Sequence, residues 1–371
     1  MPMLLKHIYN DVFFNEFGKA AETVIPHFKS SAYINKVQQY NWDLLQLKQR
    51  MRRLSFVLHD FIPGSYSKQL TTILSLIAAI PNPSKVQYAG LAYMFLPDFI
   101  EQFGQDDLVG SLKALEKITP FSSCEFAIRP FLRSHSNETM QQMEQWAQHT
   151  NEHVRRFASE GCRPRLPWGM GIDLLKKNPS IILPILNLLK NDESPYVRRS
   201  VANNLNDISK DHPEIVLEIA AKWLGKTTQT DHLLKNACRG LLKKGDPLAL
   251  NLFGTANHVK CSVTQLKGSS KKIAIGGNIQ FSFVLQLLAN ESARLRIEYA
   301  VHFMKANGEQ RQKVFKISES HIKPNEKVIY TKKQSFKDLT TRKHYPGEHK
   351  ISIIVNGVVR QQLTFSLLKI P

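Results

Sequence analysis

The chain has 371 residues, of which 42% are hydrophobic and 22% charged, as in ordinary folded proteins, and its length suits two or three domains. Its 50 Lys and Arg outnumber 31 Asp and Glu and leave a net charge of +19. This excess favours a polyanionic partner, either nucleic acid or an anionic membrane, although surplus lysine that only keeps the protein in solution is an alternative.

No segment predicts a membrane span or a signal peptide. The longest apolar stretch, residues 181–189, is about half of the roughly 20 residues that a membrane-spanning helix requires. The N-terminal segment has no apolar core of signal-peptide length, because Lys6, Asn10 and Asp11 interrupt it. The four cysteines are scattered without a CxxC pair, which favours buried thiols in a reducing compartment over a disulfide framework or a zinc site. We therefore expect a cytoplasmic protein.

Residues 1–254 are predicted to be helical throughout. Apolar residues recur at spacings of three and four, and prolines cluster in short breaks such as residues 80–84. The segment around Val154 is repeated around Val197 and, more weakly, around Leu234, at spacings of 43 and 37 residues. Periods near 40 residues with two helices in each unit indicate HEAT-like repeats stacked into a curved solenoid.

After Gly254 the pattern changes to strands. Residues 279–285, 295–301 and 350–355 alternate in polarity over at least part of their length, and turn pairs such as Asn356-Gly357 separate such runs. About seven runs of this kind fit an immunoglobulin-like sandwich. The predicted fold is therefore multidomain: an all-α HEAT-like repeat solenoid over residues 1–254, followed by an all-β immunoglobulin-like sandwich over residues 257–371.

The predicted sandwich is the more densely basic part. Residues 257–371 contain 20 Lys and Arg against 7 Asp and Glu. One hypothesis is that the sandwich binds backbone phosphates, and the alternative is a solvated lysine-rich edge that discourages strand pairing. The candidate basic cluster consists of Lys332, Lys333, Lys337, Arg342 and Lys343.

Residues 151–168 form the most informative segment. Helical spacing places Val154 and Phe157 on a core face and Arg156 and Glu160 on the opposite face. By spacing alone, Arg156 and Glu160 form an ordinary surface ion pair at i, i+4.

Asp207 and Arg199 share a face in the next repeat, so Glu160 and Asp207 could converge on one surface. Trp168, in the loop after the helix, is by itself more typical of a packing residue than of a ligand platform. Carboxylates among arginines that bind phosphate would repel the ligand, so they need either a structural partner or a chemical task. The arginines in question are Arg155, Arg156, Arg163 and Arg165.

Residues 151–168 resemble the signature of the AlkC-type proteins, within the AlkC/AlkD group of HEAT-like-repeat DNA glycosylases. Residues 121–131 and 203–208 match the same pattern in order. One branch of the AlkC type carries a C-terminal immunoglobulin-like domain, so the resemblance extends over essentially the whole chain. The tryptophan pair and the aspartate typical of the AlkD branch are not evident in matching context, which argues against transferring the mechanism of that branch.

The resemblance implies excision of cationic methylated bases, chiefly 3-methyladenine and 3-methylcytosine, as the first step of base excision repair. Its active-site candidates are Glu125, Glu160, Trp168 and Asp207. We expect Glu160 to position water beneath the anomeric carbon, with Glu125 and Asp207 beside it. Trp168 would stack on the cationic base or on the sugar. A base alkylated on a ring nitrogen is a cationic leaving group before the bond breaks and needs no proton, so no general acid, metal or other cofactor is expected.

Double-stranded DNA that contains alkylated bases is the expected partner, and a monomer associated with the nucleoid is the expected state. A non-catalytic HEAT-repeat scaffold that binds DNA or protein is the main alternative. A peripheral membrane protein is less favoured, because no amphipathic anchor with a polybasic flank stands out. The predicted DNA contacts are Arg155, Arg156, Arg163, Arg165 and Arg199 in the helical part and Lys332 and Lys333 in the sandwich.

Overall fold

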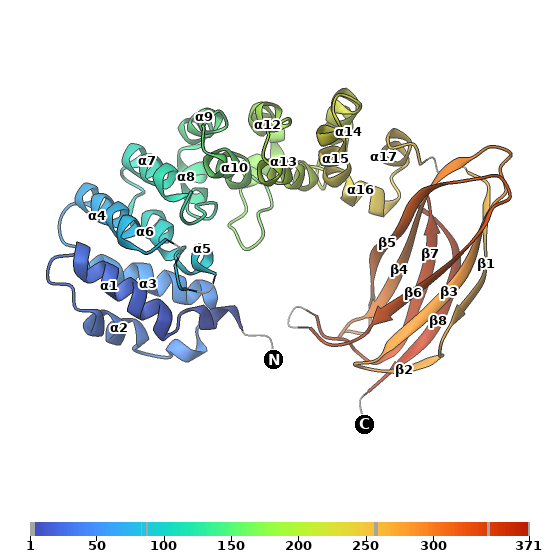
Figure 1. Ribbon diagram of the computed structural model, residues 1–371, viewed down its shortest axis with the longest axis horizontal. Helices are drawn as coiled ribbons and strands as arrows, with labels where there is room; N and C mark the ends of the chain where they lie inside the picture. Colours follow the sequence, from blue (N-terminus) through green and yellow to red (C-terminus); the bar gives the residue numbers. More distant parts are fainter. Residues whose placement is uncertain (1–3, 83, 87, 256–258, 340–341, 370–371) are drawn as a thin grey trace. The chain divides into compact units, whose positions relative to one another are not determined.

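The computed structural model describes residues 4–82, 84–86, 88–255, 259–339 and 342–369 (Figure 1). The chain forms two compact units. The first consists of Met1–His212 and Gly225–Ala237, and the second of Pro213–Leu224 and Cys238–Pro371. Within the described residues, no helix is both long and apolar enough to cross a membrane.

In its described residues, the first unit contains helices and the loops between them but no strand, which confirms the prediction for this part of the chain. Three short 3-10 helices, Leu5–Ile8, Trp42–Leu44 and Pro179–Ile182, interrupt the α-helical pattern. The α-helices are α1 (Asp11–Val24), α2 (Ser30–Gln38), α3 (Leu47–Phe61), α4 (Tyr66–Ala79), α5 (Ala89–Ala92), α6 (Phe95–Phe103), α7 (Leu108–Ile118), α8 (Arg129–Ser134), α9 (Ser136–Trp146), α10 (Glu152–Gly161), α11 (Asp173–Lys177), α12 (Leu183–Leu189), α13 (Pro195–Ile208) and α15 (Thr228–Ala237).

The repeated segments of the sequence form α10, α13 and α15. Each helix buries its matching apolar residue, Val154, Val197 or Leu234. α10 packs against α13, and α13 packs against α15, so that the three helices form a row. α9 and α12 form a second layer that packs along one side of this row (Figure 1). The row brings the C-terminal ends of α10 and α13 next to each other, and the candidate site lies at these ends.

Side-chain caps define where these two helices begin. The side chain of Asn151 accepts a hydrogen bond from the His153 amide at the start of α10. The Ser194 hydroxyl accepts from the Tyr196 amide at the start of α13, and Pro195 occupies the first helical position, where no amide hydrogen is needed. Phe157 then stacks on Trp146 of α9 with ring centres 4.9 Å apart, which anchors α10 to the core.

The described part of the second unit forms three helices and two sheets. The helices are α14 (Pro213–Trp223), α16 (Arg239–Lys244) and α17 (Pro247–Leu252). One sheet has the strand order β1-β3-β6 and the other β2-β8-β7-β4-β5, and only β2 and β8 pair in parallel. The strands are β1 (Cys261–Gly268), β2 (Lys272–Ala274), β3 (Asn278–Leu287), β4 (Ala293–Met304), β5 (Gln310–Ile322), β6 (Lys327–Ser335), β7 (Gly347–Val355) and β8 (Val358–Leu368).

Both sheets contribute to one apolar core. Phe281 and Phe283 on β3 are buried together with Ile351 and Ile353 on β7. The alternation of buried and exposed residues along β3 produces this arrangement, because successive strand side chains point to opposite faces. The predicted sandwich is confirmed.

The end of α16 meets the sandwich directly. Gly245 ends α16 with φ +74°, and Gly357 lies in the β7–β8 turn with φ +79°. A Cβ atom on Gly245 would lie 2.9 Å from the Cα of Gly357, so the two backbones meet without room for a side chain. The compact unit that holds the strands therefore also holds α14, α16 and α17, which the predicted boundary at residue 254 placed in the first domain. Residue 257, where the second domain was predicted to begin, lies outside the described residues.

Candidate active site

Three predicted carboxylates meet in one chain of ion pairs. Arg163, just after α10, donates to Glu160 at 2.6 Å and to Asp207 at 2.8 Å. Arg156, one turn before Glu160, contacts Glu125 and lies 3.6 Å from the Glu160 carboxylate. Carboxylates and guanidinium groups thus alternate from the segment before α8, through α10, to the end of α13. The predicted convergence of Glu160 and Asp207 from neighbouring repeats is present in the structure, but both carboxylates are buried and do not lie on an exposed surface as the spacing suggested.

The three carboxylates differ in their access to solvent. The Glu125 side chain is 16% exposed, Glu160 is 7% exposed and Asp207 is 2% exposed. Ser200 on α13 donates to the second oxygen of Glu160 at 2.7 Å, and Ser159 lies 2.5 Å from the Ser200 hydroxyl. Glu125 is therefore the most accessible carboxylate, whereas Glu160 is held in place from two helices.

The charges in this network balance locally. Burial lowers the pKa of the Arg156 guanidinium, but Glu125 and Glu160 more than offset this effect and raise the pKa above its ordinary value. Burial likewise lowers the pKa of Arg163, and its pairing with Glu160 and Asp207 gives a net rise. Both arginines stay charged. Because each buried charge has a partner of opposite sign, the network avoids the cost of an isolated buried ion.

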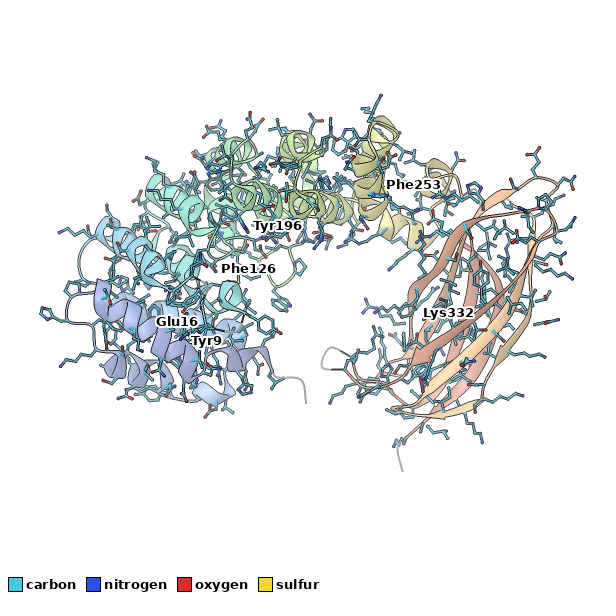
Figure 2. All side chains as sticks on the ribbon, viewed as in Figure 1. Tyr9, Glu16, Phe126, Tyr196, Phe253 and Lys332 are labelled. Atoms are coloured by element: carbon cyan, nitrogen blue, oxygen red, sulfur yellow. The ribbon has the colours of Figure 1, made fainter. Side chains whose placement is uncertain are left out.

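Tyr196 and Lys210 complete the polar surroundings of the network. The guanidinium carbon of Arg156 lies 5.0 Å from the centre of the ring of Tyr196, a residue of α13 that Figure 2 labels. Lys210, beyond the end of α13, donates to Asp207 at 2.7 Å. Asp207 therefore has a cationic partner on each of its oxygens.

Three of the arginines predicted to bind DNA phosphates have other partners. Arg156 and Arg163 belong to the network, and Arg155 donates to Asp192 at 2.6 Å and to the carbonyls of His149 and Thr150 at 3.0 and 2.7 Å. Their guanidinium groups are largely buried, so they do not form the exposed phosphate-binding surface that we predicted. Helical spacing identified their faces but not the acidic residues of neighbouring helices.

Arg165 and Arg199 remain accessible. The Arg165 side chain is 41% exposed and pairs with Asp211 at 2.6 Å. Arg199 is exposed on α13 and lines a hollow of about 430 Å³ that α13 and α15 share. His232 and Gln229 on α15 line the same hollow.

Trp168 lies on an exposed loop with a constrained backbone. Its side chain is 63% exposed, and its φ of +63° is in the left-handed region, which is unusual for a bulky residue. Arg129 on α8 is fully buried and donates to the carbonyls of Gly161 at 2.9 Å and Arg163 at 2.8 Å, and also to that of Met170. Burial lowers the pKa of Arg129 to about 10. Arg129 was not among the residues predicted from the sequence, although it lies in the matched block of residues 121–131.

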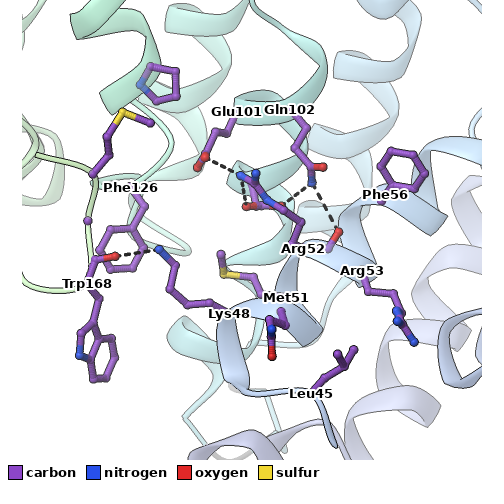
Figure 3. Close-up of a pocket in the computed structure, with 15 residues that line it drawn as sticks. Leu45, Lys48, Met51, Arg52, Arg53, Phe56, Glu101, Gln102, Phe126 and Trp168 are labelled. Carbon is purple, nitrogen blue, oxygen red and sulfur yellow. Dashed lines mark hydrogen bonds and ion pairs between the residues drawn. The ribbon is translucent and has the colours of Figure 1, made fainter. Parts of the chain in front are cut away.

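A hollow of about 870 Å³ lies beside this loop (Figure 3). Helices α3 and α6, the segment that holds Phe126, and the Trp168 loop line it. Lys48 on α3 donates to the Trp168 carbonyl at 2.8 Å, and Arg52 on the same face pairs with Asp98 and Glu101 of α6 at 3.3 and 2.5 Å. Sequence reasoning missed these residues, whose only local signal is the i, i+4 spacing of Lys48 and Arg52.

The two predicted lysines of the sandwich lie on β6, an edge strand of the three-stranded sheet (Figure 2 labels Lys332). Lys332 is half-buried and Lys333 is exposed. Consecutive strand residues point to opposite faces, so the two lysines do not form one patch. Their edge position is compatible with both the phosphate-binding hypothesis and the edge-protection alternative.

Comparisons with known proteins agree with these features. Residues 116–240 match a family model described as a DNA alkylation repair enzyme, and this segment contains Glu125, Glu160, Trp168 and Asp207. Residues 262–369 match the model of the C-terminal Ig-like domain of an uncharacterised protein, YhaZ.

Two relatives match almost the whole chain. The uncharacterised protein YhaZ of Bacillus subtilis is 44% identical over 363 residues, which cover 98% of this chain and 99% of that protein. The solved structure of the Pseudomonas fluorescens alkylpurine DNA glycosylase AlkC, bound to DNA with an abasic-site analogue, is 36% identical. That comparison covers 99% of this chain and 100% of the other, with a TM-score of 0.92. This chain therefore belongs to the AlkC-type family of DNA alkylation repair proteins, in the branch that carries a C-terminal immunoglobulin-like domain.

Proposed function

We propose that this protein is a DNA glycosylase that hydrolyses the N-glycosidic bond of cationic alkylated bases in double-stranded DNA. The substrates are 3-methyladenine and 3-methylcytosine, and their release begins base excision repair. The observation that carries the proposal is the likeness over the whole chain to an alkylpurine DNA glycosylase solved on DNA. The convergence of Glu125, Glu160 and Asp207 supplies groups suited to this reaction.

The chemistry needs little from the protein beyond charge and position. A base methylated on a ring nitrogen is already cationic, so it leaves as a neutral base without receiving a proton. The glycosidic bond breaks, its electron pair goes to the base, and the sugar develops oxocarbenium character. A fixed carboxylate stabilises that cation, orients the water that adds to the anomeric carbon and accepts the proton that this water loses, which leaves a hydroxyl group on the sugar. The reaction as written uses water and carboxylates alone, and we propose that it needs no metal or other cofactor.

Glu160 is suited to orient the water. A carboxylate has about four acceptor positions, and Arg163 and Ser200 donate to two of those on Glu160. Because Arg163, just after α10, and Ser200 on α13 hold it in place, Glu160 does not have to reorganise during the reaction. Glu125, the most accessible carboxylate, would face the sugar, and Asp207 would orient Arg163. Trp168 offers an exposed indole for stacking on the cationic base or the sugar, an interaction of about 0.5–2 kcal/mol.

Arg165 and Arg199 are the proposed phosphate contacts of the helical part, because they are the exposed members of the predicted set. Lys333 is the exposed candidate on the sandwich. We propose that the protein acts as a monomer in the cytoplasm, at the nucleoid, where its substrate lies.

The test uses methylated duplex DNA in single-turnover reactions, with the released bases identified by mass spectrometry. Glu160→Gln keeps the shape of the side chain and removes its charge, so it should bind lesion DNA normally and release 3-methyladenine about 100-fold more slowly. Glu125→Gln should also release 3-methyladenine more slowly than the parent protein. Glu138→Gln on α9, an exposed glutamate outside the network, should match the parent protein.

The outcomes separate the candidate functions. If the parent protein releases no base, the non-catalytic scaffold is the better description. If Glu160→Gln stays within a few-fold of the parent rate, the role given to Glu160 is wrong. Release of 3-methyladenine without 3-methylcytosine would narrow the substrate class.

A further inference from the structure

Lys48 on α3 contacts two segments of the candidate site, one around Phe126 and one around Trp168, both of which are distant from α3 in the sequence. Its ammonium group donates to the carbonyl of Trp168 at 2.8 Å and lies 4.7 Å from the centre of the Phe126 ring. Figure 3 shows Lys48 extending from α3 to this carbonyl, with the Phe126 ring beside it and the indole of Trp168 pointing away. Phe126 directly follows Glu125, so Lys48 bridges the loops that carry two of the proposed active-site residues.

The Trp168 loop needs support of this kind. A tryptophan with φ +63° persists only where its surroundings determine the backbone conformation. The indole is 63% exposed and contributes little packing. Arg129 holds the residues on either side of Trp168 through the carbonyls of Arg163 and Met170. Lys48, on α3, holds the carbonyl of Trp168 itself.

We infer that Lys48 is a positioning residue that sets the Trp168 backbone, and through it the indole, relative to Glu125. The inference rests on the proposed glycosylase function for its effect on the reaction, but the contact itself can be tested without DNA. An exposed lysine beside a nucleic-acid site would ordinarily be assigned to a phosphate. Here the ammonium group already donates to a carbonyl and faces an aromatic ring, and both contacts set the geometry of the two loops.

The first experiment measures how acrylamide quenches the fluorescence of Trp168 in the full-length protein without DNA. Of the other three tryptophans, Trp42 and Trp146 are buried and Trp223 is half-buried. Subtracting the signal of a Trp168→Phe variant removes their contribution and isolates that of Trp168. Lys48→Met keeps most of the side-chain length and removes the charge and the donor, so the quenching constant of Trp168 should change. Lys48→Arg keeps a charged donor and should resemble the parent. Lys19→Met on α1, an exposed lysine away from both loops, is the matched control.

The second experiment measures base release and DNA binding with the same variants. Lys48→Met should slow single-turnover release about tenfold, because the stacking group is no longer held in place. Its affinity for undamaged duplex, and the slope of log affinity on log salt, should stay at the parent values. A slope reduced by about 0.9 would instead identify Lys48 as a phosphate contact.

The two failures are distinguishable. Unchanged Trp168 quenching in Lys48→Met, in a protein whose circular dichroism matches the parent, would overturn the positioning role whatever the enzyme does. Absence of base release by the parent protein would overturn the glycosylase proposal and leave the quenching result intact. Changed quenching together with an unchanged release rate would show that Lys48 holds the loop but does not serve the reaction, and would also overturn the inference.

Discussion

Arg163 donates to the carboxylate of Asp207, 44 positions further along the chain, at 2.8 Å. The guanidinium lies just after α10 and the carboxylate in the last turn of α13, so one side chain joins two successive repeats. The Arg163 side chain is 8% exposed and that of Asp207 is 2% exposed. Arg163 also donates to Glu160, which means that its removal would leave two buried carboxylates without their main partner.

Replacing Arg163 by Met should therefore destabilise the helical unit by about 3–5 kcal/mol, the usual cost of breaking a buried pair from one side. The measurement is the urea transition of the helical signal, followed by circular dichroism. Base release should also fall, because Glu160 and Asp207 lose their common support.

Arg165→Met is the matched control for that change. Arg165 also pairs with an aspartate, Asp211, just beyond the end of α13. The Arg165 side chain, however, is 41% exposed and that of Asp211 is 29% exposed. Solvent screens such a pair, so the stability should change by less than about 1 kcal/mol. Equal losses in the two variants would contradict the claim that burial of the network determines its importance.

The strained backbone at Trp168 leads to a prediction about two substitutions that both remove the indole. Glycine adopts φ +63° without penalty, whereas alanine does not, so Trp168→Gly should be more stable than Trp168→Ala by about 1 kcal/mol. This order reverses the usual preference for alanine. Differential scanning calorimetry of the two variants measures this difference. A more stable alanine variant would show that the left-handed conformation is not retained in solution.

Both variants should lose base release to a similar extent, since neither retains a ring for stacking. A glycine variant as active as the parent would mean that the loop backbone, and not the indole, serves the reaction.

The periodicity of the sequence was sufficient to predict the helical part, the sandwich and the convergence of Glu160 with Asp207. Each of these follows from spacing along one helix or strand and from the repeat that sets α10 beside α13. The ion-pair partners of the arginines could not be predicted in this way. Arg155 and Asp192 are 37 residues apart, and spacing shows which face a side chain occupies but not which charge it meets on a neighbouring helix.

The contact of Lys48 with Trp168 could not be predicted for the same reason, and it joins residues that are even further apart in the sequence. Lys48 contacts a residue 120 positions away, and its i, i+4 spacing from Arg52 gives no indication of that contact. The left-handed conformation of Trp168 also has no local signal, because glycine and not tryptophan is typical of that region. The packing of α14, α16 and α17 with the sandwich depends on tertiary contacts such as the approach of Gly245 to Gly357, which no change in composition reveals.

Arg199 offers a direct test of the revised DNA-binding surface. Arg199→Ala should reduce the slope of log affinity on log salt by about 0.9, since one phosphate contact is lost, and weaken binding to damaged and undamaged duplex alike. Arg155→Met should leave the slope unchanged, because Arg155 donates to Asp192 and to backbone carbonyls. Fluorescence-anisotropy titrations at several salt concentrations measure both. The opposite result would restore Arg155 as a phosphate contact and remove Arg199.

His349 in the sandwich predicts a dependence of stability on pH. It is fully buried on β7, stacks on Phe365 with ring centres 5.7 Å apart, and its Nε2 lies 3.1 Å from the carbonyl oxygen of Tyr345. Burial lowers its pKa below the ordinary value, and His344 adds to this effect, whereas the Tyr345 carbonyl opposes it. The folded state therefore keeps His349 neutral at a pH where the unfolded chain protonates it.

The unfolded state then binds more protons than the folded state as pH falls below about 6.5, so stability from this residue is complete above that pH and is lost progressively below it. Hydrogen exchange of the β7 amides, corrected for the intrinsic rate at each pH, should show weaker protection at pH 5.5 than at pH 7.5. His349→Leu has no proton to gain and should reduce this difference by up to about 1 kcal/mol. Part of the dependence should persist, because burial also lowers the pKa of His302 on the neighbouring β4. An identical pH dependence in the variant would show that His349 takes up its proton without unfolding.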